Sequence, residues 1–160
     1  MPNCNIGQNC NVLQNAVISS DVVLGSNVKA QNNVSIYTRV TCDEDVFLEL
    51  SMVFTNVINP RSAINKKNEY MKTHVGKGAV IGANATIVCG YDIGKFAFIS
   101  AGAVVTKEVP DYSLVVGNRS RQIGGMSECG QKLNFDKDGK AQCVESKEWY
   151  QIIDGKVIKR

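Results

Sequence analysis

Apolar residues recur at every sixth position through most of this chain. The first such column comprises Ile6, Val12, Ile18, Leu24, Ala30, Ile36, Cys42, Leu48 and Phe54, and after a break it resumes as Val75, Ile81, Ile87, Ile93, Ile99 and Val105. An α-helix repeats near 3.6 residues and a strand at 2, so neither element sustains this period. The pattern predicts a parallel β-helix, in which each repeat is a short strand plus a turn and three repeats close one coil. The chain should therefore form about five stacked coils.

A second column, four residues after the first, is mostly small and apolar, and we expect it to lie where the wall of the β-helix bends. Its members are Cys10, Ala16, Val22, Val28, Val34, Val40, Val46, Met52, Ala79, Ala85, Tyr91, Ala97, Ala103 and Val109. The expected turn residues are Gly7, Gly25, Gly76, Gly82 and Gly94, each directly after an inward residue, and the corner residues Asn27, Asn33 and Asn84. Glycine and asparagine tolerate a positive φ at low cost, which explains both choices at the sequence level.

The repeat breaks at residues 59–72 and ends near Pro110. The break is polar and basic, so it should protrude from the β-helix as a loop, and long excursions from a rigid scaffold usually carry function. We therefore divide the chain into a β-helix over 1–110 and a C-terminal extension over 111–160. Two β-hairpins are expected in the extension, one across 135–143 and one across 149–158 with Asp154-Gly155 at its turn.

The cysteines and the single histidine limit the possible metal chemistry. One histidine, His74, excludes a metal site built from three histidines of one chain. Cys129 and Cys143 suggest a zinc ribbon, but Met126 and Ser146 stand where two further ligands would complete it, so we expect a metal-free β-hairpin cap. The other cysteines fall within the apolar repeat, where cysteine behaves as a small hydrophobe.

Composition and charge give a broad class. The net charge is +3, which suits an anionic small molecule better than nucleic acid. No apolar run approaches the roughly 20 residues of a membrane span. The N-terminal segment MPNCNIGQNC lacks the pattern of a signal peptide, so a cytoplasmic protein with reduced thiols is expected.

Three stretches carry a more specific signal: QNNVSIY (31–37), MVFTNVINPRS (52–62) and IGANATIVCG (81–90). They resemble the nucleotide-sugar 3-N-acetyltransferases, a branch of the left-handed β-helix acyltransferases with hexapeptide repeats. The resemblance implies a left-handed β-helix, a homotrimer and acetyl-CoA as co-substrate, without a metal. It also implies acetylation of the 3-amino group of a UDP- or dTDP-linked amino sugar, in the biosynthesis of surface polysaccharide such as lipopolysaccharide.

The resemblance also assigns residues. Acetyl-CoA is expected in a groove between neighbouring protomers, against Ala83, Ala101, Thr106, Lys107 and Arg121. Small side chains would let the pantetheine approach the backbone, and the two cations would face the CoA phosphates. The residues expected to bind the sugar nucleotide are Asn32, Asn33, Tyr37, Thr55, Asn59 and Arg61.

The acceptor atom depends on which residue lies at the mouth of the loop. Relatives that acetylate hydroxyl groups use a histidine there as a base, whereas this chain carries Asn56 and Asn59. A sugar amine is already partly neutral near pH 7 and can attack without a base, so Asn56 is expected to orient an amine acceptor.

Two alternatives remain open. His74 at the far end of the loop could act as the base of an O-acetyltransferase. The chain could also be a degenerate, non-catalytic scaffold, because relatives begin about one coil earlier and have Gly-Pro where Glu49-Leu50 stands here.

Overall fold

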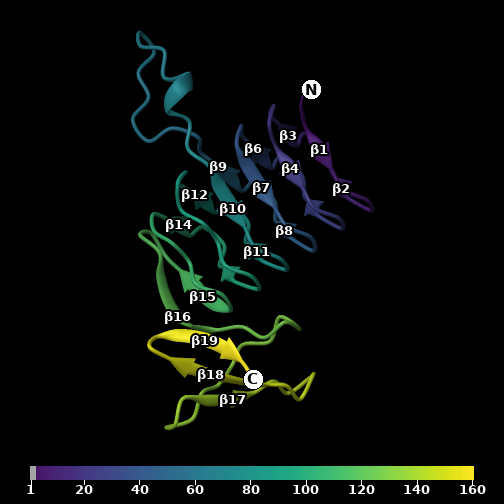
Figure 1. Cartoon of the computed structure of the whole chain (residues 1–160), viewed down its shortest axis with the longest axis vertical. Coiled ribbons are helices and arrows are strands. Elements are labelled where there is room, and N and C mark those ends of the chain that lie inside the picture. The colour runs from purple at the N-terminus through teal and green to yellow at the C-terminus, as the bar shows by residue number, and fades with distance from the viewer. Residues whose placement is uncertain (1–2) are drawn as a thin grey trace.

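Short parallel strands stack into a three-faced solenoid (Figure 1) in a computed structural model that describes residues 3–160. Met1 and Pro2, the start of the segment in which no signal peptide is expected, lie outside this range. The first face contains β1 (Asn5–Ile6), β4 (Val23–Leu24), β7 (Val40–Cys42) and β10 (Thr73–Val75). The second face contains β2 (Asn11–Val12), β5 (Lys29–Ala30), β8 (Phe47–Leu48), β11 (Val80–Ile81), β13 (Phe98–Ile99) and β15 (Ser113–Val116). The third face contains β3 (Val17–Ile18), β6 (Ser35–Ile36), β9 (Val53–Phe54), β12 (Thr86–Ile87) and β14 (Val104–Val105).

Turns join the faces at three corners, which we number in chain order. The first corner joins the first face to the second, as at residues 25–28. The second corner joins the second face to the third, as at 31–34, and the third corner leads back to the first face, as at 37–39. The predicted all-β parallel β-helix is confirmed.

The solenoid has about six coils rather than the five predicted. The turn after Val105 is two residues shorter than the others, so Val109 pairs with Ile93 and Val115 with Ile99. Val109 therefore belongs to the inward column and not to the corner column in which the sequence pattern put it. The parallel pairing of the second face continues beyond residue 110, because Leu114 and Val115 pair with Phe98 and Ile99. The division of the chain at residue 110 remains a prediction.

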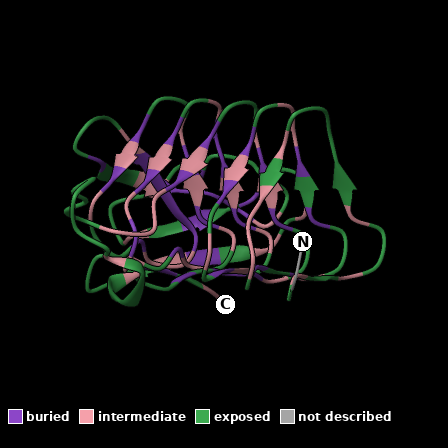
Figure 2. Cartoon of the chain, turned by 90° about the horizontal axis from the view of Figure 1, so that it is seen from above, coloured by how far each residue is buried: buried purple, intermediate pink, exposed green. Residues whose placement is uncertain are grey.

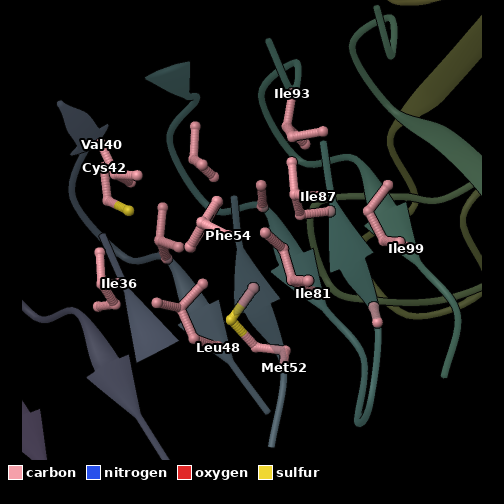
Figure 3. Close-up of a cluster of buried hydrophobic side chains, with 14 of the residues drawn as sticks. Ile36, Val40, Cys42, Leu48, Met52, Phe54, Ile81, Ile87, Ile93 and Ile99 are labelled. Carbon is pink, nitrogen blue, oxygen red and sulfur yellow. The ribbon is translucent and has the colours of Figure 1, made fainter. Parts of the chain in front are cut away.

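The interior of the solenoid is filled by both apolar columns (Figure 3), with Leu48, Phe54 and Ile81 fully buried. Tyr91 does not follow the corner column. It is half-buried, whereas Cys89, two residues before it, is buried. At the N-terminal end the inward residues are uncovered: Ile6 is 47% and Val12 39% exposed (Figure 2).

The corner asparagines and the turn glycines have different physical reasons. Asn27, Asn33 and Asn84 have φ values of 59°, 62° and 56°, as predicted. The glycines that follow inward residues do not have a positive φ, so that part of the prediction is wrong. At Gly25 a Cβ atom would lie 2.5 Å from the backbone nitrogen of Glu44 in the next coil. Glycine is required there because the turns of successive coils stack in contact.

Replacing Gly25 with alanine should therefore destabilise the solenoid by about 2 kcal/mol or more, because backbone must move to accept the methyl group. Gly124→Ala is the matched control, since a Cβ at that position meets nothing within 4 Å. Urea denaturation of the two variants beside the unmodified chain measures the difference. A Gly25→Ala midpoint equal to that of Gly124→Ala would contradict the stacking explanation.

A loop interrupts the third corner between β9 and β10 (Figure 1). It contains a bridge between Arg61 and Ile64 and the short helix η1 (Lys67–Glu69). The predicted excursion over 59–72 is thus present, and it already starts at Thr55, directly after β9. The loop stands away from the stacked coils, as its polar sequence predicts.

The C-terminal extension forms strand β16 (Arg121–Gly125), antiparallel to β15, and a small antiparallel sheet of β17 (Lys140–Gln142), β18 (Trp149–Ile153) and β19 (Lys156–Lys159). The hairpin of β18 and β19 is confirmed, with positive φ at Asp154 and Gly155. The other predicted hairpin, across 135–143, is wrong because β17 pairs with β18. Residues 136–140 form a turn closed by the Asp136 carboxylate, which accepts the N–H groups of Asp138 and Lys140 at 2.9 Å each.

The sheet packs against the first corner of the solenoid through aromatic rings. Tyr112 stacks on Phe96 at 5.5 Å and meets the buried ring of Tyr150 edge-on at 5.6 Å. Lys159 Nζ donates to Glu128 Oε2 at 2.7 Å and to Glu148 Oε1 at 2.6 Å, and the Tyr112 hydroxyl donates to Glu128 Oε1 at 2.9 Å. Side chains of the solenoid and of the cap thus share one network of hydrogen bonds.

This network predicts a loss of stability in acid. The hydrogen bond from Lys159 lowers the pKa of Glu148 from its usual 4.5. A carboxylate with a lowered folded-state pKa stabilises the fold above its unfolded pKa, and this contribution is lost as the pH falls through the folded value. We expect Glu148→Gln to reduce the difference between the urea midpoints of unfolding at pH 6 and at about pH 3.5. Urea titrations of the variant and of the unmodified chain at both pH values measure this difference. An unchanged difference would show that Glu148 does not contribute.

Among residues 3–160, no helix is long and apolar enough to cross a membrane.

Candidate functional site

The neck of the loop is closed by contacts between its two ends. The Met71 N–H donates to the Asn56 carbonyl at 2.9 Å, and the Cys89 N–H of the next coil donates to Thr55 Oγ1 at 3.0 Å. From the coil below, Arg39 Nη1 donates to the Tyr70 carbonyl. These contacts fix the backbone at Asn56, so its side chain leaves the third corner from a defined position.

The Asn56 amide is half-buried, and within residues 3–160 no hydrogen bond engages its side-chain atoms. Tyr37, at the same corner one coil below, is 39% exposed. An oriented amide without a partner can accept a hydrogen bond from an amine or donate one to a carbonyl or hydroxyl oxygen. The neck therefore brings together Asn56, Thr55 and Tyr37 of the predicted site.

Asn59 and Arg61 lie farther out on the loop and are exposed. The Arg61 guanidinium donates to the Pro60 carbonyl at 3.0 Å and forms no ion pair within residues 3–160, so it is available to an anion. A hollow of about 330 Å³ within the loop is lined by Arg61, Lys66, Lys67 and Tyr70, among others. The predicted role of Arg61 in clamping an anionic group stays a prediction.

A second group of predicted residues occupies the second corner. Asn32, Ala83 and Ala101 stack in one column, with Leu50 between Asn32 and Ala83. Backbone hydrogen bonds join the successive turns, from Asn84 to Leu50 at 3.0 Å and from Gly102 to Ala83 at 2.8 Å. Asn33 is the corner residue with positive φ and accepts a hydrogen bond from Asn15 at 3.4 Å, which gives it a structural role.

The predicted acetyl-CoA residues are divided between two corners. Ala83 and Ala101 lie at the second corner, whereas Thr106 and Lys107 lie at the third. Arg121 begins β16 and pairs with Val116 at the end of the second face. Lys107 is exposed and lines a hollow of about 150 Å³ at the C-terminal end of the solenoid, beside Ser120 and Gln122. The Ser120 hydroxyl next to it is buried without a hydrogen-bond partner.

The third face separates these two corners. Its outward residues are Val17, Ser35, Val53, Thr86 and Val104, none of them charged. The two groups of predicted residues, which we call the two half-sites, therefore lie on either side of an uncharged face.

His74 lies apart from both half-sites, on the first face in β10. Its Nε2 is 3.0 Å from Asp43 Oδ1, and its backbone N–H donates to Asp92 Oδ1 at 2.7 Å. Both side chains of the pair are accessible, and they border a hollow of about 330 Å³ that Lys95 and Glu108 also line. A carboxylate on one ring nitrogen sets the tautomer and leaves the other nitrogen free as a base.

Sequence reasoning missed Asp43 as the partner of His74. The two residues are 31 positions apart, because the loop lies between their coils, whereas Asn27 and Asp45, hydrogen-bonded partners in adjacent coils before the loop, are 18 apart. The pair could have been found only by treating the loop as an insertion into one repeat, because the coils of Asp43 and His74 are then neighbours.

Of the two cysteines in the C-terminal extension, the buried Cys143 contacts serine residues. Cys143 Sγ is 3.3 Å from Ser127 Oγ and accepts the Ser146 N–H at 3.5 Å, and these hydrogen bonds lower the pKa of the thiol to about 6. Cys143 therefore contacts both Ser127 and Ser146. Residues 3–160 contain no group of three His, Cys, Asp or Glu side chains that could hold a metal ion.

Comparisons with known proteins bear on the repeat and on the fold. A family model described as the hexapeptide repeat of succinyl-transferase matches residues 3–38 and 72–107, on either side of the loop. The dTDP-3-amino-3,6-dideoxy-alpha-D-galactopyranose 3-N-acetyltransferase of Aneurinibacillus thermoaerophilus is 45% identical over 85 residues, or 52% of this chain and 43% of that protein. The chain thus spans less than half the length of this relative.

Solved structures share the fold. A maltose O-acetyltransferase from Clostridium difficile 630 has a TM-score of 0.66 at 25% identity, covering 77% of this chain and 70% of that one. A GDP-perosamine N-acetyl transferase variant from Caulobacter crescentus, solved with CoA and GDP-perosamine, has a TM-score of 0.66 at 19% identity, covering 78% and 52%. The chain is thus similar to hexapeptide-repeat acetyltransferases: the repeat model matches somewhat less than half of it, and the Aneurinibacillus relative aligns with about half. Since relatives in this family are named for amine and for hydroxyl acceptors, the acceptor must be argued from the site.

Proposed function

We propose that this chain is an acetyl-CoA-dependent N-acetyltransferase that acts on the 3-amino group of a nucleotide-linked amino sugar. The proposal includes a cytoplasmic homotrimer that serves the synthesis of surface polysaccharide. Its main support is Asn56, an unpaired amide at a loop neck that contains no histidine, in a chain 45% identical over 85 residues to a dTDP-amino-sugar 3-N-acetyltransferase.

The chemistry follows from that amide. A hydroxyl acceptor must lose its proton to a base as it attacks the thioester, whereas a neutral amine attacks with its lone pair and loses the proton afterwards. The side-chain oxygen of Asn56 would hold the amine by accepting a hydrogen bond from one of its N–H groups. Rate enhancement would come mainly from placing the amine beside the thioester carbonyl, with a backbone N–H steadying the oxyanion.

A shared site supports the trimer. If three copies pack through their uncharged third faces, the third corner of one copy meets the second corner of the next. Asn56 of one protomer would then lie beside the Ala83 and Ala101 strip of its neighbour, where acetyl-CoA is expected. Lys107 and Arg121 would bind its phosphates, since each is an exposed cation without an ion pair within residues 3–160.

The contact between His74 and Asp43 favours one second candidate, an O-acetyltransferase with His74 as base. In that case His74→Ala would remove activity on a hydroxyl acceptor and Asn56→Ala would have little effect. The amine proposal expects the opposite ranking.

The proposal is tested by following release of the CoA thiol from acetyl-CoA. Release should require a nucleotide-linked 3-amino sugar and should be absent with acetyl-CoA alone. Protein that binds acetyl-CoA and releases no thiol with any UDP- or dTDP-linked amino sugar would support the non-catalytic scaffold instead.

A further inference from the structure

The exposed side of the cap sheet carries the single tryptophan of the chain, Trp149. In β18 the Tyr150 ring is fully buried in the cap core, and because strand side chains alternate, Trp149 and Gln151 point to the opposite side. Trp149 is 49% exposed. A hollow of about 400 Å³ opens beside it, lined by Lys140, Trp149, Tyr150, Gln151 and Arg160. This hollow, which we call the Trp149 hollow, lies outside the two half-sites at the corners of the third face.

Two cations border the Trp149 hollow without being neutralised. Arg160 Nε and Nη2 donate to Gln151 Oε1 at 3.0 and 2.7 Å, so an uncharged amide holds the guanidinium in place. Lys140 lies on the neighbouring strand, directly opposite Gln151. Within residues 3–160 neither Lys140 nor Arg160 forms an ion pair, in contrast to Lys159 on the buried side of the sheet, which binds two carboxylates.

The indole of Trp149 is open to solvent over about half of its surface, with 49% exposed. Among the described residues, the cation–π contact that forms is that of Lys95 with Tyr112, and no cation covers Trp149. A fixed guanidinium, a free ammonium and an open indole ring thus surround one hollow. Aromatic faces stack on nucleobases, and Arg and Lys bind phosphate oxygens through charge-assisted hydrogen bonds.

We propose that the Trp149 hollow binds a nucleoside diphosphate, with the base on the indole and the phosphates between Arg160 and Lys140. The volume lies within the range of small-molecule sites, which is about 300–1,000 Å³. A planar base joined through ribose to two phosphates occurs both in the ADP part of CoA and in the nucleotide of a nucleotide-linked sugar. The site does not depend on the proposed acetyl transfer, since binding alone defines it.

Titration of the whole chain with ADP, UDP and inorganic pyrophosphate tests the site, with Trp149 fluorescence as the reporter and a free tryptophan amide correcting for absorbance by the nucleotides. We expect saturable quenching by both nucleotides, tighter with ADP because the purine offers the larger stacking area. Preference for UDP over ADP would assign the site to sugar nucleotides. Absence of saturable quenching, or equal quenching by pyrophosphate, would overturn the proposal.

Arg160→Gln should weaken nucleotide binding by about tenfold, because it removes a fixed charge from the phosphates. Lys156→Gln is the matched control, since it removes a positive charge from the same sheet outside the hollow. Calorimetry with Trp149→Leu separates binding from the fluorescence signal and should show the nucleotide affinity lost. Equal affinities of Arg160→Gln and Lys156→Gln would overturn the proposed phosphate contact.

Discussion

Asn56→Ala should lower kcat for an amine acceptor by about 100-fold, since a misplaced nucleophile costs a factor of this size. The KM for acetyl-CoA should change little, because Asn56 is expected to contact the amine, whereas the small residues and the cations of the proposed site would hold the co-substrate. The neck itself should survive the substitution, since the Met71 N–H bonds to the backbone carbonyl of residue 56 and not to its side chain. Steady-state kinetics with both substrates varied would separate the two parameters.

Asn134→Ala is the matched control for this experiment. Asn134 is an exposed asparagine of the C-terminal extension, so its truncation removes the same amide far from the loop. We expect unchanged kinetics for the control. A loss of kcat in His74→Ala that exceeds the loss in Asn56→Ala would contradict the assignment of Asn56 and favour the base that Asp43 orients.

Ala101→Leu should weaken acetyl-CoA binding by about 10- to 100-fold. The branched, four-carbon side chain of leucine at this position would occupy the space over the second corner in which the pantetheine is expected to lie against the backbone. An overlap of this kind costs about 1–3 kcal/mol, and 1.4 kcal/mol is tenfold in affinity. Calorimetric titration with acetyl-CoA measures the change, and the melting temperature without ligand should stay the same.

The fold itself already accepts leucine at this kind of position. Leu50 occupies the same column two coils below Ala101 and is 49% exposed, so the corner geometry tolerates the side chain. Ser26→Leu supplies the control, because Ser26 holds the equivalent place in a turn of the first corner. Unaltered acetyl-CoA affinity in Ala101→Leu would mean that the co-substrate does not use the second corner.

Most of the solenoid could be predicted because an apolar residue stands at every sixth position along the chain. Each inward residue repeats the environment of the one before it, so Ile81, Ile87 and Ile93 are predicted by the same rule and are all buried. The rule failed where the spacing changed. The turn after Val105 is shortened, so the sixth coil did not follow the period of six and was not predicted. The hairpin across 135–143 was not formed because residues before the Asp136 turn make no strand, and β17 pairs with β18 instead.

The reasons behind the turn residues were harder to read. A glycine required by a positive φ and one required by a backbone atom of the next coil look the same in sequence, as Gly78 and Gly25 illustrate. The contact of His74 with Asp43 was equally hidden, since it depends on how the loop interrupts the coil count. The proposed amine acceptor rests on the residue types at the loop neck, where asparagine stands instead of histidine.

The most direct test of the proposed activity is the identity of the product. The protein would be incubated with acetyl-CoA and pairs of UDP- and dTDP-linked sugars that differ only in an amino or a hydroxyl group at the 3-position. Mass spectrometry would then show which members gain an acetyl group. The proposal predicts one acetyl group on an amino sugar and none on its hydroxyl counterpart. Acetylation of the hydroxyl sugar, or of neither sugar by protein that binds acetyl-CoA, would contradict it.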